Sequence, residues 1–246
     1  MTALARLKQD DIAISGLPAR LDLAGALLFP DEGILVVADL HLEKGSSFAR
    51  RGQMLPPYDT RETLAALALV VARHGPRTVI ALGDSFHDVD GPARLGRDER
   101  EAIAAVQAGR DWIWITGNHD RALPPEIGGE VAAEFQLGPL TLRHEPKPGE
   151  QAEIAGHLHP AGRVVLRGRG VRRRCFLTDG RRCVLPAFGA YAGGLNACDP
   201  AFRPLFPGGF TAHLLGEGRI FAEEVGGEAG GKERPEGGSQ ALRPPA

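Results

Sequence analysis

The sequence is poor in the residues that mark several protein classes. Its 246 residues include only three cysteines, two methionines, two tryptophans and two tyrosines. Cys175, Cys183 and Cys198 match neither a pair of CxxC zinc motifs nor a dense disulfide framework, so we expect reduced thiols. The opening residues lack the apolar run of a signal peptide or a membrane span. These absences favour a protein of the cytoplasm.

The chain also lacks a strong charge of either sign. A formal net charge of −2 excludes overall steering toward nucleic acid, so such a partner would need a local basic patch. Hydrophobic residues make up 43% of the chain, which is enough for a sizeable core. We expect one domain over residues 1–225. Residues 226–246 are almost wholly Gly, Pro and polar or charged residues, and we predict a disordered tail.

Three short apolar runs, residues 34–38, 78–82 and 112–116, have the pattern of buried strands. Each run ends in a polar cluster, which places polar side chains where sites form in α/β proteins. Between the first two runs, Asp59 and Glu62 predict a capping box for an amphipathic helix that ends before Gly75.

From about Val131 onward the sequence changes to short strand-like segments separated by Gly and Pro. An α/β front half joined to a β-rich back half predicts an α/β fold, a four-layer α-β-β-α sandwich in which two facing mixed sheets are flanked by helices. The segments expected as strands are residues 140–143, 153–155, 163–166, 183–185, 212–215 and 220–223.

The polar clusters contain carboxylates, imidazoles and an amide, which are hard or borderline metal ligands. Such a set can hold two divalent ions about 3.5–4 Å apart, a spacing at which one ion activates water while both hold the oxygens of a phosphoryl group. Cleavage of a phosphate ester is the reaction that this chemistry predicts. The clusters are Asp39-x-His41, Gly83-Asp84, Gly117-Asn118-His119-Asp120, His144 and Gly156-His157-x-His159.

The ordered series of clusters resembles the calcineurin-like metallophosphoesterase superfamily, over residues 34–159. The resemblance implies that His119 is a catalytic histidine that assists the leaving group. Sites made of His, Asp and Asn accept manganese, iron or zinc, and we expect manganese, with iron or zinc as alternatives. Asp120 is interpreted as a local turn-former. In the ligand set that the resemblance implies, Asp39, His41 and His159 hold the first ion, Asn118, His144 and His157 hold the second, and Asp84 bridges them.

The block Gly83-Asp84-Ser85-Phe86-His87 resembles the Gly-Asp-x-Phe-His block of DNA-repair nucleases in the same superfamily. In protein Ser/Thr phosphatases an Asp stands at the position of His87, and an Arg-Gly pair that this chain lacks follows it. His87 is therefore a second candidate catalytic residue, with a solvent-facing loop histidine as the alternative.

Residues 38–45, 51–60 and 185–196 resemble bacterial ligase-associated DNA damage response endonucleases. That resemblance implies a manganese-dependent DNA endonuclease. It also implies an ATP-dependent DNA ligase, a helicase and an exonuclease-like protein as partners encoded nearby.

Eight arginines lie between residues 163 and 182, with Asp179 as the only acid among them. Such a patch can neutralise a DNA backbone, although the general preference of this chain for Arg over Lys is an equal explanation. Arg172, Arg173 and Arg174 are the candidate DNA contacts.

Two other functions remain open at the level of sequence. A phosphomonoesterase or a cyclic-nucleotide phosphodiesterase would use the same ions on a small substrate. A non-catalytic scaffold for repair proteins would keep the fold alone, but it would have no need for His119 beside a full set of ligands.

Overall fold

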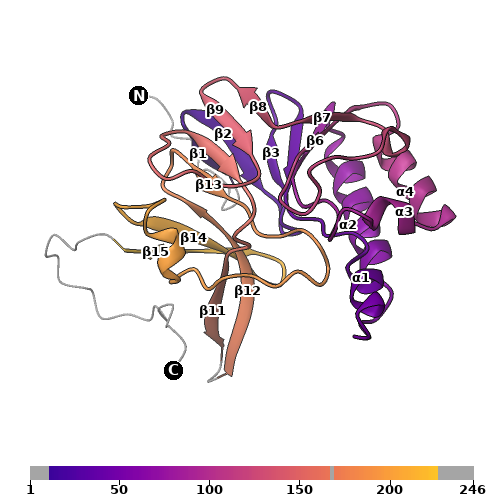
Figure 1. Ribbon diagram of the computed structural model, residues 1–246. Helices are drawn as coiled ribbons and strands as arrows, with labels where there is room; N and C mark the ends of the chain where they lie inside the picture. Colours follow the sequence, from indigo (N-terminus) through magenta and orange to yellow (C-terminus); the bar gives the residue numbers. More distant parts are fainter. Residues whose placement is uncertain (1–10, 167–168, 227–246) are drawn as a thin grey trace, which may run out of the picture.

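The apolar strands pair into two β-sheets that pack face to face (Figure 1). The structure, a computed structural model, describes residues 11–166 and 169–226. The buried layer between the sheets draws side chains from both, such as Val36, Ile80 and Ile113 from the first and Ile154 and Phe176 from the second.

The first sheet has seven strands in chain order. Strands β1 to β4 are antiparallel, and β4 to β7 are parallel. The carboxyl ends of β4, β5 and β6 therefore meet at one edge, where their polar clusters follow. The strands are β1 (Asp11–Ile14), β2 (Leu17–Leu21), β3 (Leu27–Phe29), β4 (Ile34–Val37), β5 (Thr78–Leu82), β6 (Asp111–Ile115) and β7 (Glu130–Ala132).

The second sheet is also mixed, with the strand order β15-β14-β12-β13-β10-β9-β8 and with β11 paired to β12. Strands β9, β10 and β13 are parallel, so the loops after β9 and β10 begin at the same edge. The strands are β8 (Glu134–Leu137), β9 (Leu140–Arg143), β10 (Glu153–Ala155), β11 (Ala161–Leu166), β12 (Arg169–Thr178), β13 (Cys183–Val184), β14 (Phe210–Leu215) and β15 (Ile220–Val225).

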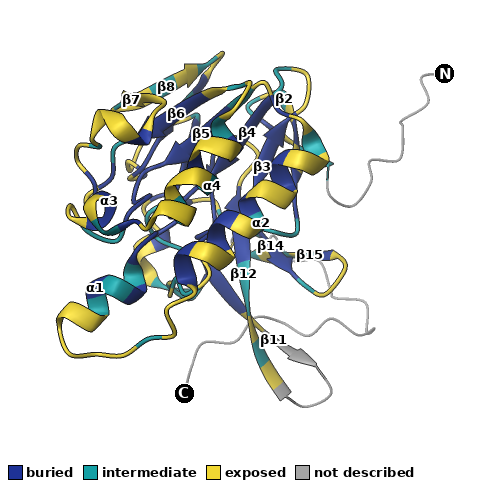
Figure 2. Cartoon of the chain, turned by 90° about the vertical axis from the view of Figure 1, so that its right-hand side faces the viewer, coloured by how far each residue is buried: buried dark blue, intermediate teal, exposed yellow. Residues whose placement is uncertain are grey.

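Helices cover the outer face of the first sheet, where α2 and α4 turn exposed sides to solvent and buried sides to the strands (Figure 2). The outer face of the second sheet is covered by the 3-10 helix η2 and its loop, through Phe202, Leu205 and Phe206. The helices are α1 (Lys44–Arg50), α2 (Asp59–His74), α3 (Gly91–Arg94), α4 (Arg97–Gln107), η1 (Pro125–Ile127) and η2 (Pro200–Phe202).

The predicted α/β class with two mixed sheets and flanking helices is confirmed. The helix expected after residue 58 is α2, and Gly75 ends it in the left-handed conformation. The predicted capping box is wrong: the N-cap is Tyr58, and the carboxylate of Asp59 instead accepts a hydrogen bond from the backbone N–H of Gly45. The expected tail, from Gly227 onward, lies outside the described residues.

No helix in residues 11–166 and 169–226 has both the length and the apolar character required to cross a membrane.

A buried carboxylate fastens the end of α2 to the loop after β2. Asp22 Oδ2 lies 2.7 Å from His74 Nε2 and 2.9 Å from Arg73 Nη1, and Asp22 Oδ1 accepts the backbone N–H of Ala24 at 2.7 Å. Burial alone would raise the pKa of Asp22. The hydrogen bonds with His74, with the backbone of Ala24 and with Arg73, together with the charge of Arg73, outweigh burial and lower the pKa below 3.8.

We predict that Asp22→Asn lowers the free energy of unfolding by about 1–3 kcal/mol at neutral pH, because it removes the charge from a buried hydrogen-bonded group. Since the folded-state pKa lies below the unfolded-state value, this stabilisation is fully present above pH 3.8 and disappears as the pH falls through the folded-state pKa. Urea unfolding of the parent and the variant, at neutral pH and at a pH well below 3.8, measures the difference.

The exposed Asp31 provides the control, as Asp31→Asn should leave both curves unchanged. A difference between parent and Asp22→Asn that stays constant at all pH values would contradict this account.

Candidate metal centre

The predicted ligands come together from loops at the edge where both sheets end. Asp39 and His41 follow β4, Asp84 follows β5, His144 follows β9, and His157 begins the loop after β10. The loops after β4 and β5 continue the pairing of these strands. The backbone N–H of Asp39 donates to the carbonyl oxygen of Gly83, and that of His41 donates to the carbonyl oxygen of Asp84. Parallel pairing therefore places the first two carboxylates in adjacent loops.

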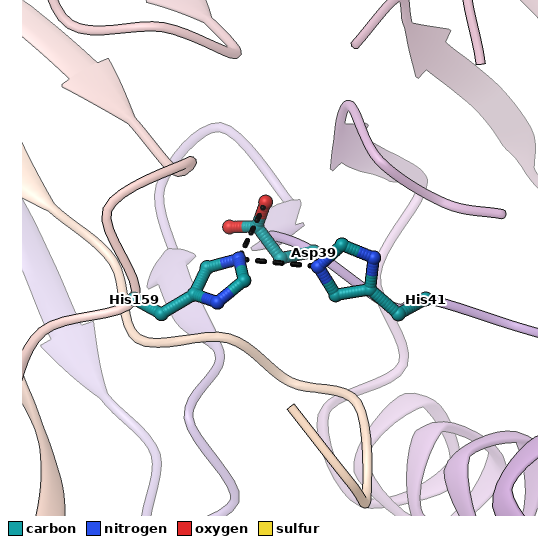
Figure 3. Close-up of side chains that lie close together, drawn as sticks. All are labelled: Asp39, His41 and His159. Atoms are coloured by element: carbon teal, nitrogen blue, oxygen red, sulfur yellow. Dashed lines mark hydrogen bonds and ion pairs between the residues drawn. The ribbon is translucent and has the colours of Figure 1, made fainter. Parts of the chain in front are cut away.

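The side chains form two groups of candidate ligands, each with ligand atoms within 4.8 Å of one another. The first group is Asp39, His41 and His159, and its side chains converge as shown in Figure 3. The second group is Asp84, His144 and His157. Both groups correspond to the division between two ions that the family resemblance implies.

In the first group the imidazoles and the carboxylate face a common point. His41 Nε2 and His159 Nε2 are 3.2 Å apart, and His159 Nε2 is 3.2 Å from Asp39 Oδ1. Ligand atoms that bind one ion at 2.0–2.2 Å lie roughly 3 Å from each other, which is the spacing found here. Asp39 Oδ1 is buried and has no hydrogen-bond partner among the described residues, whereas Oδ2 accepts the backbone N–H of His157. A cation at this point would satisfy the free oxygen.

The second group is held in the same way. His144 Nδ1 lies 2.9 Å from the carbonyl oxygen of Leu82, which can only accept, so Nδ1 carries the proton and Nε2 is left as the ligand atom. His144 Nε2 lies 2.9 Å from Asn118 Oδ1, 3.2 Å from His157 Nδ1 and 3.4 Å from Asp84 Oδ2. Asn118 thus joins this group, as the resemblance implies.

The two groups adjoin each other. His144 Nδ1 is 3.7 Å from Asp39 Oδ1, and the charge of Asp84 raises the pKa of His41 against the stronger lowering by burial and by His159. Asp84 therefore acts electrostatically on both groups, and its role as the bridging ligand stays a prediction.

The titration of the imidazoles fits a cation site. Burial and the neighbouring His159 lower the pKa of His41 to about 3, which keeps the ring neutral as a metal ligand must be. Burial lowers the pKa of His144 too, but the hydrogen bond to Asp84 and the charges of Asp39 and Asp84 outweigh this and raise it to about 9. The carboxylates of Asp39 and Asp84 thus stabilise a positive charge on His144, and they could stabilise a divalent ion at the same place.

Most of the predicted ligands have an unusual backbone conformation. Within the described ranges seven residues other than glycine have positive φ, and five of them are predicted ligands. Positive φ is uncommon for residues other than glycine, and strained residues of this kind cluster at functional sites. His157 and His159 are among them, and both lie in the loop after β10 rather than on an extended strand. The five ligands are Asp39 (φ 54°), His41 (45°), Asp84 (45°), His157 (68°) and His159 (46°).

Both predicted catalytic histidines lie beside the ligands. The rings of His87 and His119 are stacked with centroids 5.5 Å apart, and each contacts the ring of His41 edge-on. His119 Nε2 is 3.9 Å from Asp84 Oδ2, and its side chain is 41% exposed, so it can reach a substrate. Burial, followed by the charges of Lys44 and His119, lowers the pKa of His87 to about 4. His87 is half-buried rather than solvent-facing.

The predicted arginine patch is divided. Arg172 and Arg173 lie on the β11–β12 hairpin, which extends away from the sandwich in Figure 1. Arg182 is buried near the other end of β12 beside Glu153, roughly 20 Å away at 3.3 Å per residue. Arg174 donates to the carbonyl oxygens of Ala187 and Phe188 and so supports the fold. Arg167 lies outside the described residues.

Asp120 has a larger role than the sequence interpretation gave it. Its buried carboxylate accepts four backbone N–H groups: those of Asp84 and Gly117 on Oδ1 at 3.0 Å, and those of Ser85 and Phe86 on Oδ2 at 2.6 and 3.1 Å. Only the bond from Gly117 is local, and the other three tie the loop after β6 to the loop after β5. A Cβ on Gly117 would overlap Asp84, so the two loops touch because this residue is glycine.

A cavity of about 820 Å³ lies elsewhere, around Arg181, Pro204 and Phe210, and none of the predicted site residues is among the described residues that line it.

We predict that Asp120→Asn lowers the free energy of unfolding and weakens metal binding. An amide nitrogen cannot accept, so at least one buried N–H group loses its partner, at a cost of about 1–3 kcal/mol. The displaced loops should reduce the affinity for Mn²⁺ by roughly 10–100-fold. Urea unfolding and calorimetric titration with Mn²⁺ measure the two effects.

Asp199→Asn is the matched control, because Asp199 accepts one N–H at the exposed start of η2, where Asn serves equally well. Unchanged Mn²⁺ affinity in Asp120→Asn would show that the hydrogen bonds of Asp120 do not position the predicted ligands.

Comparisons with known proteins agree with this geometry. A family model for calcineurin-like phosphoesterases matches residues 33–170, which is 138 of the 246 residues. Among solved structures, the nuclease MPE of Pseudomonas putida is 31% identical, with a TM-score of 0.65 over 87% of this chain and 98% of that chain.

A protein of unknown function, AQ665 of Aquifex aeolicus, is 17% identical over 51% of this chain and 78% of that chain, with a TM-score of 0.37. No curated protein matches the chain. The family match covers every predicted metal ligand, and by it and by the likeness to the nuclease the chain belongs to the calcineurin-like phosphoesterases.

Proposed function

We propose that this protein is a two-metal phosphodiesterase that cleaves DNA as an endonuclease in bacterial DNA repair. The observation that carries the proposal is the pair of adjoining ligand groups with His119 next to them. The structural likeness to the nuclease MPE of Pseudomonas putida supports the choice of a phosphodiester substrate.

The two ligand groups would hold two divalent ions, for which we propose Mn²⁺, with iron or zinc as alternatives because His, Asp and Asn sites accept all three. When bound, such ions polarise phosphoryl oxygens and lower the pKa of a water molecule. The neutral imidazole of His41 and the carboxylates of Asp39 and Asp84 provide ligands without excess negative charge.

His119 has the position of a group that assists the leaving oxygen. Its backbone N–H donates to Asp84 Oδ1 at 2.9 Å, which fixes the residue against a ligand carboxylate. Its ring is supported on one face by His87 and at the edge by His41. The exposed ring can donate an N–H to an oxygen that departs from phosphorus, as a general acid does. His87, kept neutral, holds the ring of His119 in place without adding charge.

The β11–β12 hairpin supports a nucleic-acid substrate. Arg172 is exposed, and its guanidinium donates to the carbonyl oxygen of Gly194, which itself packs against His159. This side of the hairpin thus adjoins the metal centre. Arg173 points to the other face, where it pairs with Glu217. We propose Arg172 as the principal phosphate contact and Arg173 as a lesser one, and we exclude Arg174, whose guanidinium is occupied by backbone carbonyls.

The cellular setting is proposed on the sequence resemblance alone. It comprises the cytoplasm and cooperation with an ATP-dependent DNA ligase, a helicase and an exonuclease-like protein. Hydrolysis of a phosphomonoester or a cyclic nucleotide is the competing activity, and no contact in the described residues favours it.

We predict that the parent protein cleaves DNA in the presence of Mn²⁺ and that His119→Ala reduces this cleavage by roughly 10²–10⁴-fold, the usual contribution of a general acid. The measurement is a time course on supercoiled, linear and single-stranded DNA, with metal content determined for each preparation. His119→Ala should retain its metal, whereas Asp84→Ala should lose metal and activity together. DNA cleavage by His119→Ala at the parent rate would remove His119 from the mechanism.

We predict that Arg172→Gln weakens DNA binding and reduces the slope of log affinity against log salt by about one, the loss of a single phosphate contact. Fluorescence anisotropy of labelled DNA measures both quantities. Arg61→Gln, which removes an exposed arginine from the outer side of α2, is the matched control and should bind as the parent does. Equal slopes in parent and Arg172→Gln would place the DNA elsewhere.

A further inference from the structure

Lys44 lies close to the candidate metal centre but has no role in the cleavage reaction proposed for it. It begins α1, three residues after the ligand His41. Its ammonium group donates to the carbonyl oxygen of Tyr191 at 2.9 Å and lies 5.8 Å from the centroid of the Phe48 ring. The side chain is half-buried.

The start of α1 is held rigidly, so the position of Lys44 is fixed by the fold. Glu43 is buried in a left-handed conformation, and its carboxylate accepts from the hydroxyl groups of Thr60 and Ser46. The next N–H, that of Gly45, donates to Asp59. These bonds join the first turn of α1 to the first turn of α2, on both sides of Lys44.

The charge of Lys44 is not matched by a carboxylate. Within the described ranges it forms no ion pair, and the acid that acts on its pKa, Asp59, already accepts the Gly45 N–H. Burial lowers the pKa of Lys44 more strongly than Asp59 raises it. A partly desolvated ammonium whose direct acceptor is one neutral carbonyl keeps two N–H donors and most of its attraction for an anion.

A row of rings connects Lys44 with the reacting centre. The Phe48 ring, which Lys44 faces, lies 5.5 Å from the ring of His87, and His87 stacks on His119 at the same separation. Phe48 and His87 thus link Lys44 to His119, and a substrate longer than a single phosphodiester could extend along them as far as Lys44.

We propose that Lys44 binds the phosphate adjacent to the one that is cleaved, on the Phe48 and His87 side of the centre, and so selects a polynucleotide over a small phosphodiester. A nucleic acid strand has a further phosphate next to the one that is cleaved, and a small aryl diester has none. The inference rests on the proposed function, since it names a specificity residue for that same site. Arg172 lies on the hairpin beside His159, so the two cations would hold the strand on two sides of the metals.

The test compares two substrates in the same preparations: a fluorescent DNA oligonucleotide and bis(p-nitrophenyl) phosphate, each with Mn²⁺. Lys44→Gln removes the charge but retains an N–H donor for Tyr191. We expect the ratio of kcat/KM for DNA to kcat/KM for the small diester to fall at least tenfold, mainly through KM. Lys44→Arg should restore the ratio, because the charge is restored.

A second measurement does not depend on the metals. Anisotropy of the same oligonucleotide, recorded without added metal, should show weaker binding by Lys44→Gln and a salt slope reduced by about one. Arg97→Gln, which removes one positive charge from the exposed side of α4, is the matched control and should match the parent in both measurements.

The outcomes separate the two proposals. If the parent hydrolyses the small diester but no DNA, the proposed function is wrong and the role of Lys44 falls with it. If the parent cleaves DNA and Lys44→Gln leaves the substrate ratio and the binding unchanged, the inference about Lys44 is wrong and the proposed function stands. Equal loss on both substrates with unchanged binding would also overturn it, because Lys44 would then support the centre itself.

Discussion

Parallel strand pairing is the constraint from which the metal centre follows. Strands β4, β5 and β6 in one sheet and β9 and β10 in the other all end at the same edge, so the residues after them are brought into contact whatever their separation in the chain. The hydrogen bonds from Asp39 to Gly83 and from His41 to Asp84 carry this alignment past the strand ends. The facing sheets then bring His144 and His157 to the same place.

The apolar layers and the polar edge have separate duties. Side chains between the sheets and under α2 and α4 supply the buried area that holds the strands in place. The polar edge supplies little hydrophobic stabilisation and is instead held by directional bonds to buried carboxylates, those of Asp120, Asp59 and Glu43. Each of these acids binds backbone or hydroxyl groups of loops that carry functional residues, and so sets the geometry of those loops.

Much of this arrangement was predictable from the sequence, and the reasons are specific. The strand that became β5 is a short apolar run and the helix that became α2 has a clear periodic pattern. Each is followed by a glycine, and the structure has both at the expected residues. The grouping of Asp39 and His41 with His159, and of His144 with His157, followed from the order of clusters that the family resemblance supplied. Periodicity alone does not bring residues more than a hundred positions apart together.

What the sequence did not reveal depends on tertiary contacts. Asp59 has the spacing of a helix cap, but in the fold a neighbouring helix offers its free N–H group, and that partner takes the carboxylate. Asp120 looks like a turn residue because one of its four bonds is local, and the other three exist only once β5 and β6 are side by side. The arginine patch looked continuous because its members are close in the sequence. In the fold, the ten residues of β12 separate them in space.

The positive φ values of five predicted ligands lower the stability of the folded protein. Five side chains with a Cβ are held at φ values between 45° and 68°, each disfavoured by roughly 1–3 kcal/mol, against a net stability of about 5–15 kcal/mol for a typical domain. Glycine would relieve each of these positions but would remove a ligand. Keeping these side chains therefore holds the fold below the stability that its hydrophobic layers alone would allow, and a cation bound to them would offset part of this cost.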